Sequence, residues 1–246
     1  MTDLPEATIS ELDGVRFLHL GSIWVQGAMR IRKPQVVELL YVQRMLASLL
    51  WLPPSLLGAG RAVQLGLGAA AITRFTHKAL KMPTTAVELN PQVVEACRAW
   101  FHLPAEVDVQ VADAGAWIEQ APPQGIQLLH VDLYDHDAAA PVLDSEAFYA
   151  ACRRALEDDG VFAVNLFGRR ASFEASAARI AAAFGPAHTW SIQPTREGNT
   201  VVVATRALPL PQRDELAARA ATIEARFGAL GLSARKWTRM IRPYAA

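Results

Sequence analysis

The stretch Ala62-Val-Gln-Leu-Gly66-Leu-Gly68-Ala-Ala-Ala71 joins a short apolar run to a pair of glycines and then to helix-forming alanines. This order predicts a strand, a tight turn and a helix. Glycines at the turn let the backbone approach a ligand closely, and the helix N-terminus favours polar or anionic groups. The spacing Gly66-x-Gly68-x-x-Ala71 also satisfies the dinucleotide fingerprint. Alone this pattern is weak, and a strand-to-helix turn without a ligand is the alternative.

From Arg61 to Arg206, short β-branched runs alternate with helical patterns. The predicted strands are Ala62–Leu67, Thr84–Leu89, Val107–Val111, Ile126–Asp132 and Gly160–Leu166. The predicted helices are Ala70–Leu80, Pro91–Trp100, Ala114–Gln120, Ser145–Leu156 and Ala171–Phe184. Near-continuous apolar strands are typical of a parallel sheet that is covered on both faces, and the alternation indicates right-handed βαβ units. The sequence therefore predicts a doubly wound α/β fold.

A hairpin and two flanking segments complete the predicted organisation. His188–Ile192 and Thr200–Thr205 flank a turn with Gly198 and Asn199, which predicts a terminal antiparallel hairpin. We divide the chain into three regions. Residues 1–55 contain a strand-like opening, Val15–Val25, and an apolar helix, Val36–Leu52. Residues 56–206 form a nucleoside-binding α/β domain, and residues 207–246 form a basic helical extension with a helix over Pro211–Leu230. After Leu210 there are seven basic residues against three acidic ones.

Composition excludes several classes of protein. The 246 residues include 24 basic and 24 acidic side chains, so no net charge attracts nucleic acid or an acidic membrane. The N-terminus is polar and lacks a secretory signal pattern, which favours the cytoplasm. The apolar run Val36–Leu52 carries charged residues and is shorter than the roughly 20 residues that span a bilayer. Cys97 and Cys152 lie in predicted helices as reduced, buried thiols, and no Cys/His cluster indicates a metal site.

Two acidic residues follow the strands next to the glycine turn. Glu88 ends the second predicted strand, where a carboxylate can accept both hydrogens of a ribose diol. Both nicotinamide and adenosyl nucleosides use such a group, and a solvated carboxylate before the next helix is the alternative. Asp113 follows the third strand, where adenosyl-transferases place a carboxylate on the adenine amino group. An ordinary helix N-cap is the other interpretation of Asp113.

Two further carboxylates come at the end of the fourth predicted strand. Asp132 and Asp135 lie beside the point where open α/β sheets bind ligands. One of them could act as a general base toward an amine, or the two could bind a cation. The alternative is that both are polar loop residues without a function.

These residues together resemble the spermidine synthase family, the polyamine aminopropyltransferases, from about Trp24 to Ala204. The family's glycine turn corresponds to Leu65-Gly66-Leu67-Gly68, its ribose-binding Val-Glu-Ile-Asp to Val87-Glu88-Leu89-Asn90, its adenine-binding Asp to Asp113, and its catalytic Asp-Ser-Ser-Asp-Pro to Asp132-Leu133-Tyr134-Asp135-His136. The resemblance implies a seven-stranded, methyltransferase-like sheet with a small N-terminal β element. It also implies a cofactor site of Gln26, Gly66, Gly68, Glu88, Asp113 and Ala114, a catalytic base at Asp132, and acceptor binding by Tyr134 and Asp135.

The chain departs from the family where the acceptor binds. The family's glycine turn carries an Asp, and Ala69 stands in its place. The family's Tyr-His-Glu block reads Tyr41-Val42-Gln43-Arg44, and its aromatic C-terminal loop reads Pro194-Thr195-Arg196-Glu197-Gly198-Asn199-Thr200. Arg44 and Arg196 would repel a polyamine if they faced the site. The nucleoside half therefore looks retained and the acceptor half altered.

The leading hypothesis is a transferase that binds S-adenosylmethionine or its decarboxylated form as co-substrate. Its acceptor is a small amine or another small nucleophile. A homodimer is a possible oligomeric state. No metal, nucleic acid or membrane is expected to take part. A methyltransferase is the first alternative, because the same sheet serves both chemistries. A nicotinamide-dependent oxidoreductase has only the glycine pattern and Glu88 in its favour. A non-catalytic ligand-binding homologue, in which Ala69 records a lost activity, is the fourth hypothesis.

Overall fold

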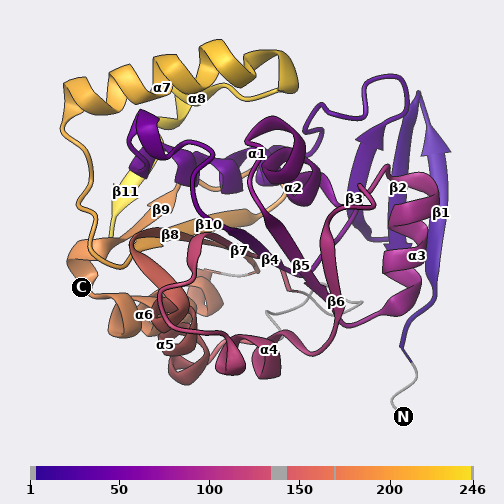
Figure 1. The fold of residues 1–246 in the computed structure, drawn as a ribbon, viewed down its shortest axis with the longest axis horizontal. Coiled ribbons are helices and arrows are strands. Elements are labelled where there is room, and N and C mark those ends of the chain that lie inside the picture. The colour runs from indigo at the N-terminus through magenta and orange to yellow at the C-terminus, as the bar shows by residue number, and fades with distance from the viewer. Residues whose placement is uncertain (1–3, 134–142, 169, 245–246) are drawn as a thin grey trace.

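The computed structural model describes residues 4–133, 143–168 and 170–244, and it contains two sheets (Figure 1). The N-terminal sheet is formed by β1 (Ala7–Leu12), β2 (Val15–Leu20) and β3 (Val25–Arg30). The large sheet is formed by β4 (Ala62–Leu65), β5 (Thr84–Glu88), β6 (Asp108–Val111), β7 (Ile126–Val131), β8 (Leu156–Phe167), β9 (Thr189–Ile192), β10 (Asn199–Thr205) and β11 (Ile241–Pro243).

The helices follow the predicted positions with some differences. They are α1 (Leu40–Met45), α2 (Ala71–Arg74), α3 (Pro91–Trp100), α4 (Ala114–Gln120), α5 (Glu146–Ala155), α6 (Arg170–Phe184), α7 (Arg213–Phe227) and α8 (Ala234–Trp237). The predicted helix Val36–Leu52 is instead α1 followed by a 3-10 helix over Leu46–Trp51, which ends where Leu52 becomes extended before Pro53. The predicted helix Ala70–Leu80 begins at Ala71 and continues as a π-helix over Phe75–Ala79.

The large sheet has the order β11-β9-β10-β8-β7-β4-β5-β6. Strands β4 to β8 are parallel to one another, whereas β10 is antiparallel to both β8 and β9. The mostly parallel sheet and the terminal hairpin are confirmed. The number of strands is wrong by one, because the C-terminal segment adds β11 to the edge of β9 in the part of the chain that the structure describes.

Helices cover the large sheet on both faces, with α1, α2 and α7 on one side and α4, α5 and α6 on the other (Figure 1). Successive residues of a strand point to opposite faces, so neighbours in β8 and β10 belong to different cores. Val161 and Val201 pack in the core under α1 and α7, while Phe162 and Val202 pack in the core against α5 and α6. This two-sided burial explains why these strands read as unbroken apolar runs.

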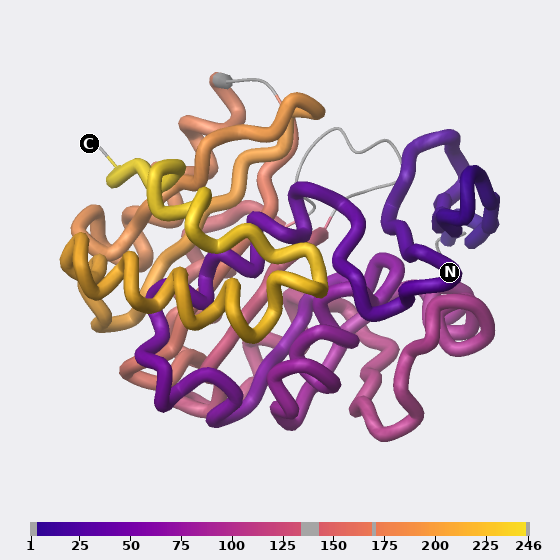
Figure 2. Tube along the Cα trace, turned by 90° about the horizontal axis from the view of Figure 1, so that it is seen from above, coloured from indigo at the N-terminus to yellow at the C-terminus, as the bar shows by residue number. Residues whose placement is uncertain are grey.

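The N-terminal sheet lies at one end of the molecule, beside α3 and away from the hairpin β9–β10 (Figures 1 and 2). Strands β1 and β2 are joined at Asp13 and Gly14, which both have positive φ, as a two-residue hairpin loop requires. Strand β3 also approaches the glycine turn closely. A Cβ atom added to Gly27 would lie 2.5 Å from the Cβ of Ala69, so only glycine permits this contact.

The C-terminal helix α7 lies across the face of the large sheet that α1 covers (Figure 2). Leu216, Ala220, Ile223 and Phe227 of α7 are buried against the sheet-covering residues of the segment 42–57. The helix predicted over Pro211–Leu230 therefore packs its apolar side chains on its own chain. Among the described residues, no helix combines the length and the apolarity that a membrane span requires.

Candidate active site

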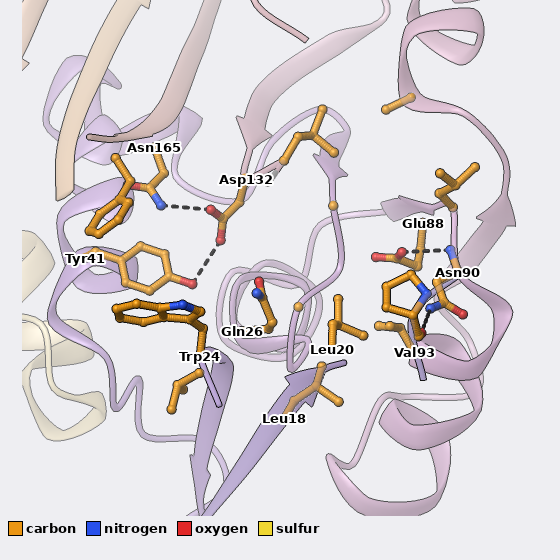
Figure 3. Close-up of a pocket in the computed structure, with 18 of the residues that line it drawn as sticks. Leu18, Leu20, Trp24, Gln26, Tyr41, Glu88, Asn90, Val93, Asp132 and Asn165 are labelled. Atoms are coloured by element: carbon orange, nitrogen blue, oxygen red, sulfur yellow. Dashed lines mark hydrogen bonds between the residues drawn. The ribbon is translucent and has the colours of Figure 1, made fainter. Parts of the chain in front are cut away.

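A cavity of about 660 Å³ runs along the carboxyl ends of the parallel strands (Figure 3). The carboxyl ends of parallel strands meet at one edge of a sheet, which is where open α/β sheets bind ligands. The cavity is lined by all the predicted site residues that the structure describes, namely Gln26, Gly66, Gly68, Glu88, Asp113, Ala114 and Asp132. Tyr134 and Asp135, the predicted acceptor residues, lie outside the described residues.

The glycine turn and Asp132 are in direct backbone contact. The Asp132 amide donates to the Leu65 carbonyl at 2.9 Å, which continues the pairing of β7 with β4. Gly66 has a φ of +85°, and a Cβ atom there would lie only 2.1 Å from the Asp132 carbonyl oxygen. Glycine is therefore required at position 66, both for its φ and for this contact.

The carboxylate of Asp132 is held by two side chains (Figure 3). The Tyr41 hydroxyl donates to Oδ2 at 3.0 Å, and the Asn165 amide donates to Oδ1 at 2.9 Å. Burial raises the pKa of Asp132, while the hydrogen bonds from Asn165 and Tyr41 act in the opposite direction. Both donors fix the carboxylate plane, and each oxygen keeps a lone pair toward the cavity.

Glu88 is half-buried and hydrogen-bonded to the backbone rather than a solvated carboxylate. Its Oε2 accepts the Leu67 amide at 2.9 Å, and its Oε1 accepts the Asn90 amide at 2.9 Å. Burial raises the pKa of Glu88, and the hydrogen bonds from the backbone amides of Asn90, Leu67 and Leu89 oppose that rise. Glu88 thus connects the end of β5 to the glycine turn, and its carboxylate lines the cavity.

Asp113 is the N-cap of α4, because its Oδ1 accepts the Ala116 amide at 2.8 Å. It also lines the cavity with its neighbour Ala114, so the two interpretations of Asp113 are compatible. Gln26 extends from β3 toward the cavity. Its Nε2 is buried and has no hydrogen-bond partner among the described residues, so an unsatisfied donor is available to a ligand.

Three of the residues that distinguish this chain from the family, Arg44, Arg196 and Ala69, do not line the cavity. Arg44 is buried, donates to the Gln193 carbonyl and does not line the cavity. Arg196 is exposed and does not line it either. The condition for repelling a polyamine, that these arginines face the site, is therefore not met. Ala69 is 2% exposed and borders a small hollow of about 10 Å³ next to Gln26.

Several lining residues were not predicted. Asn165 lies near the carboxyl end of β8, and its Oδ1 accepts the Asn199 side-chain amide at 3.2 Å. Asn199 and Glu197 belong to the turn that leads into β10, and both line the cavity. A polar residue such as Asn165 near the end of an apolar strand is a signal that the sequence did contain, whereas nothing local marks Glu197 or Asn199.

All the charged side chains that line the cavity in the described part of the chain are acidic. They are Glu88, Asp113, Asp132 and Glu197, and no described Lys, Arg or His lines the cavity. A cleft lined by carboxylates attracts cations and disfavours phosphate-rich ligands. The described residues contain no group of three or more His, Cys, Asp and Glu side chains that could hold a metal ion.

This topology defines a protein of the methyltransferase-like class. The crystal structure of a probable spermidine synthase from Corynebacterium glutamicum is similar to it with a TM-score of 0.74 at 17% identity, covering 97% of this chain and 92% of that one. The structure of human Methyltransferase-like protein 13 in complex with SAH has a TM-score of 0.67 at 22% identity, covering 76% and 92%. At these identities the likeness shows the fold.

Sequence comparison gives the family. The chain is 33% identical over 230 residues to the polyamine aminopropyltransferase of Chromobacterium violaceum, covering 92% of this chain and 86% of that protein. It is 30% identical to a polyamine aminopropyltransferase of Neisseria meningitidis, covering 91% and 85%. No family model matches the chain. The chain belongs to the polyamine aminopropyltransferase family and is a spermidine synthase-like transferase.

Proposed function

We propose that the protein transfers an aminopropyl group from decarboxylated S-adenosylmethionine to a small amine, with Asp132 as the general base. The observation that carries this proposal is the cavity itself. Its lining combines the fixed carboxylate of Asp132 with three further acidic side chains and with no described basic side chain. Both substrates of this reaction are cations, and the environment suits both.

The residues present fit an adenosyl co-substrate. The buried Nε2 of Gln26 lacks a described partner, and the carboxylates of Glu88 and Asp113 both line the cavity. A Cβ atom at Gly68 would lie 3.0 Å from the Gln26 carbonyl oxygen. Glycine at position 68 therefore lets β3 lie close to the glycine turn. The decarboxylated form fits better than S-adenosylmethionine itself, because no described cation lines the cavity to pair with a carboxylate.

The co-substrate supplies a sulfonium whose neighbouring carbon accepts a nucleophile. Asp132 would accept a proton from the acceptor's ammonium group and so expose the nitrogen lone pair. The new C–N bond forms as the C–S bond breaks, and its electrons neutralise the sulfonium to a thioether. Tyr41 and Asn165 hold the carboxylate of Asp132 toward the acceptor during this transfer. The proton then leaves Asp132 to solvent.

Product analysis by mass spectrometry tests the proposal. The protein is incubated with decarboxylated S-adenosylmethionine and a panel of mono-, di- and triamines. We expect an acceptor whose mass grows by one aminopropyl group, together with methylthioadenosine. If S-adenosylmethionine instead gives a methylated product, the protein is a methyltransferase. If neither compound is consumed, although calorimetry shows that methylthioadenosine binds, the non-catalytic hypothesis is correct.

Calorimetric titration with methylthioadenosine and NAD in parallel separates the remaining hypothesis. We expect methylthioadenosine to bind and NAD not to bind, because the described lining offers carboxylates where a pyrophosphate would lie. Tight binding of NAD would favour the oxidoreductase. A cytoplasmic location and a homodimer stay predictions, which cell fractionation and light scattering check.

A further inference from the structure

The end of the cavity at Asp132 combines an apolar wall with a second carboxylate. Trp24, from the loop between β2 and β3, is 53% exposed and lies beside Tyr41 (Figure 3). Phe167, at the end of β8, lines the same cavity. Exposed aromatic faces in a cavity favour methylene chains and cationic groups. This end therefore suits an elongated, apolar amine.

Glu197 lies in the turn between β9 and β10, which is tied to the catalytic carboxylate. The Thr195 amide donates to the Asn199 carbonyl at 2.8 Å and closes the turn. The Asn199 side chain then donates to Asn165, which donates to Asp132. A chain of side-chain hydrogen bonds thus fixes the turn that carries Glu197 relative to Asp132.

Glu197 is ionised and faces the cavity from an exposed position. Its own backbone N–H holds the pKa of Glu197 below its ordinary value, together with the Thr195 hydroxyl and the charges of Arg44 and Arg196. The two arginines do not line the cavity, but Glu197 does. The altered C-terminal loop therefore presents a negative charge to the acceptor and keeps its positive charges outside.

We propose that Glu197 binds the far ammonium group of a linear diamine whose reacting nitrogen faces Asp132. Trp24 and Phe167 form walls for its methylene chain. The far ammonium is then bound from the β9–β10 turn rather than from the glycine turn, where Ala69 carries no charge. This inference rests on the proposed function, because the proposed reaction decides which nitrogen of the diamine faces Asp132. Its test measures binding rather than turnover, so that a failure of the inference can be told apart from a failure of the proposed function.

The test compares two acceptors that differ only in the far ammonium group. 1,5-Diaminopentane and pentylamine are titrated into the full chain in the presence of methylthioadenosine. We expect the wild type to prefer the diamine and Glu197→Gln to reduce this preference about 2- to 5-fold, the range of an exposed ion pair. Arg196→Gln should increase the preference, because it removes a positive charge near Glu197. Glu95→Gln, on the exposed side of α3, is the matched control.

The outcomes separate this inference from the proposed function. If Glu197→Gln reduces the diamine preference while no aminopropyl product forms, Glu197 is an ammonium site and the proposed reaction is wrong. If products form but neither Glu197→Gln nor Arg196→Gln changes the preference, the inference is wrong. It is equally wrong if the wild type shows no preference for the diamine, or binds neither amine. Raising the salt concentration should shrink the wild-type preference, because exposed charges are screened.

Discussion

The two ends of the cavity hold their carboxylates in different ways. Glu88 and Asp113 accept hydrogen bonds from backbone amides close by in the fold of β5 and α4. Asp132 instead accepts from the side chains of Tyr41 and Asn165, which are 91 and 33 positions away in the chain. Backbone donors come with the fold, whereas side-chain donors can be exchanged by single substitutions. The proposed nucleoside end is therefore tied to the architecture, whereas the proposed acceptor end can change while the fold persists.

The largest expected effect tests whether chemistry is confined to the acceptor end. Asp132→Asn keeps the shape of the side chain and removes the base, so the turnover number should fall about 100- to 10,000-fold. Methylthioadenosine affinity should survive, since the nucleoside end is unchanged. Steady-state kinetics and calorimetry measure the two effects, with Asp214→Asn on the exposed first turn of α7 as the control. Near-normal turnover in Asp132→Asn would place the base elsewhere.

The second effect should be confined to the opposite end. Glu88→Gln replaces one acceptor oxygen by an NH2 group, so the side chain can no longer accept from both Leu67 and Asn90. We expect a loss of about 1–3 kcal/mol in methylthioadenosine binding, as for hydrogen bonds to a charged group. Calorimetry measures this loss, with Glu95→Gln for comparison. An unchanged dissociation constant would remove Glu88 from the site.

A smaller effect tests the side-chain network through pH. The Asn165 hydrogen bond lowers the pKa of Asp132, so Asn165→Ala should raise that pKa further. The base works only when ionised. The acidic limb of the turnover profile should therefore move to higher pH. Tyr41→Phe should move it in the same direction, and Thr222→Ala on α7 should leave it in place. A fall in turnover without any shift would show that Asn165 acts only on packing.

The smallest effect separates the two roles of Asp113. Asp113→Asn keeps a capping oxygen for Ala116 and removes the charge, so stability should hold while methylthioadenosine binding weakens by about 1 kcal/mol. Asp113→Ala loses the cap as well and should cost about 1 kcal/mol of unfolding free energy. Thermal unfolding and calorimetry distinguish the variants. If Asp113→Asn binds like the wild type, Asp113 is a cap alone.

Local patterns predicted the parallel strands and the positions of Glu88, Asp113 and Asp132, because strand ends and helix starts are written in adjacent residues. Strand β1 was not predicted, because most of its residues are exposed and the N-terminal sequence is polar. The pair Asp13-Gly14, which is typical of a hairpin turn, was the signal that could have revealed it. Glu197 and Asn199 could not be found in this way. They are brought to the side of the cavity that holds Asp132 only by the antiparallel pairing of β10 with β8. Local sequence patterns do not predict which strands pair.

The contact between Gly27 and Ala69 also bears on how this chain could have diverged. Strand β3 presses its backbone against Ala69, and the hollow beside it, about 10 Å³, has room for roughly one water molecule. An aspartate at position 69 would need space that β3 now occupies. The two positions are therefore coupled: a side chain larger than that of Ala69, or any side chain at position 27, would require β3 to move away from the glycine turn. A substitution at either position is expected to act on the placement of the whole N-terminal sheet as well as on the cavity.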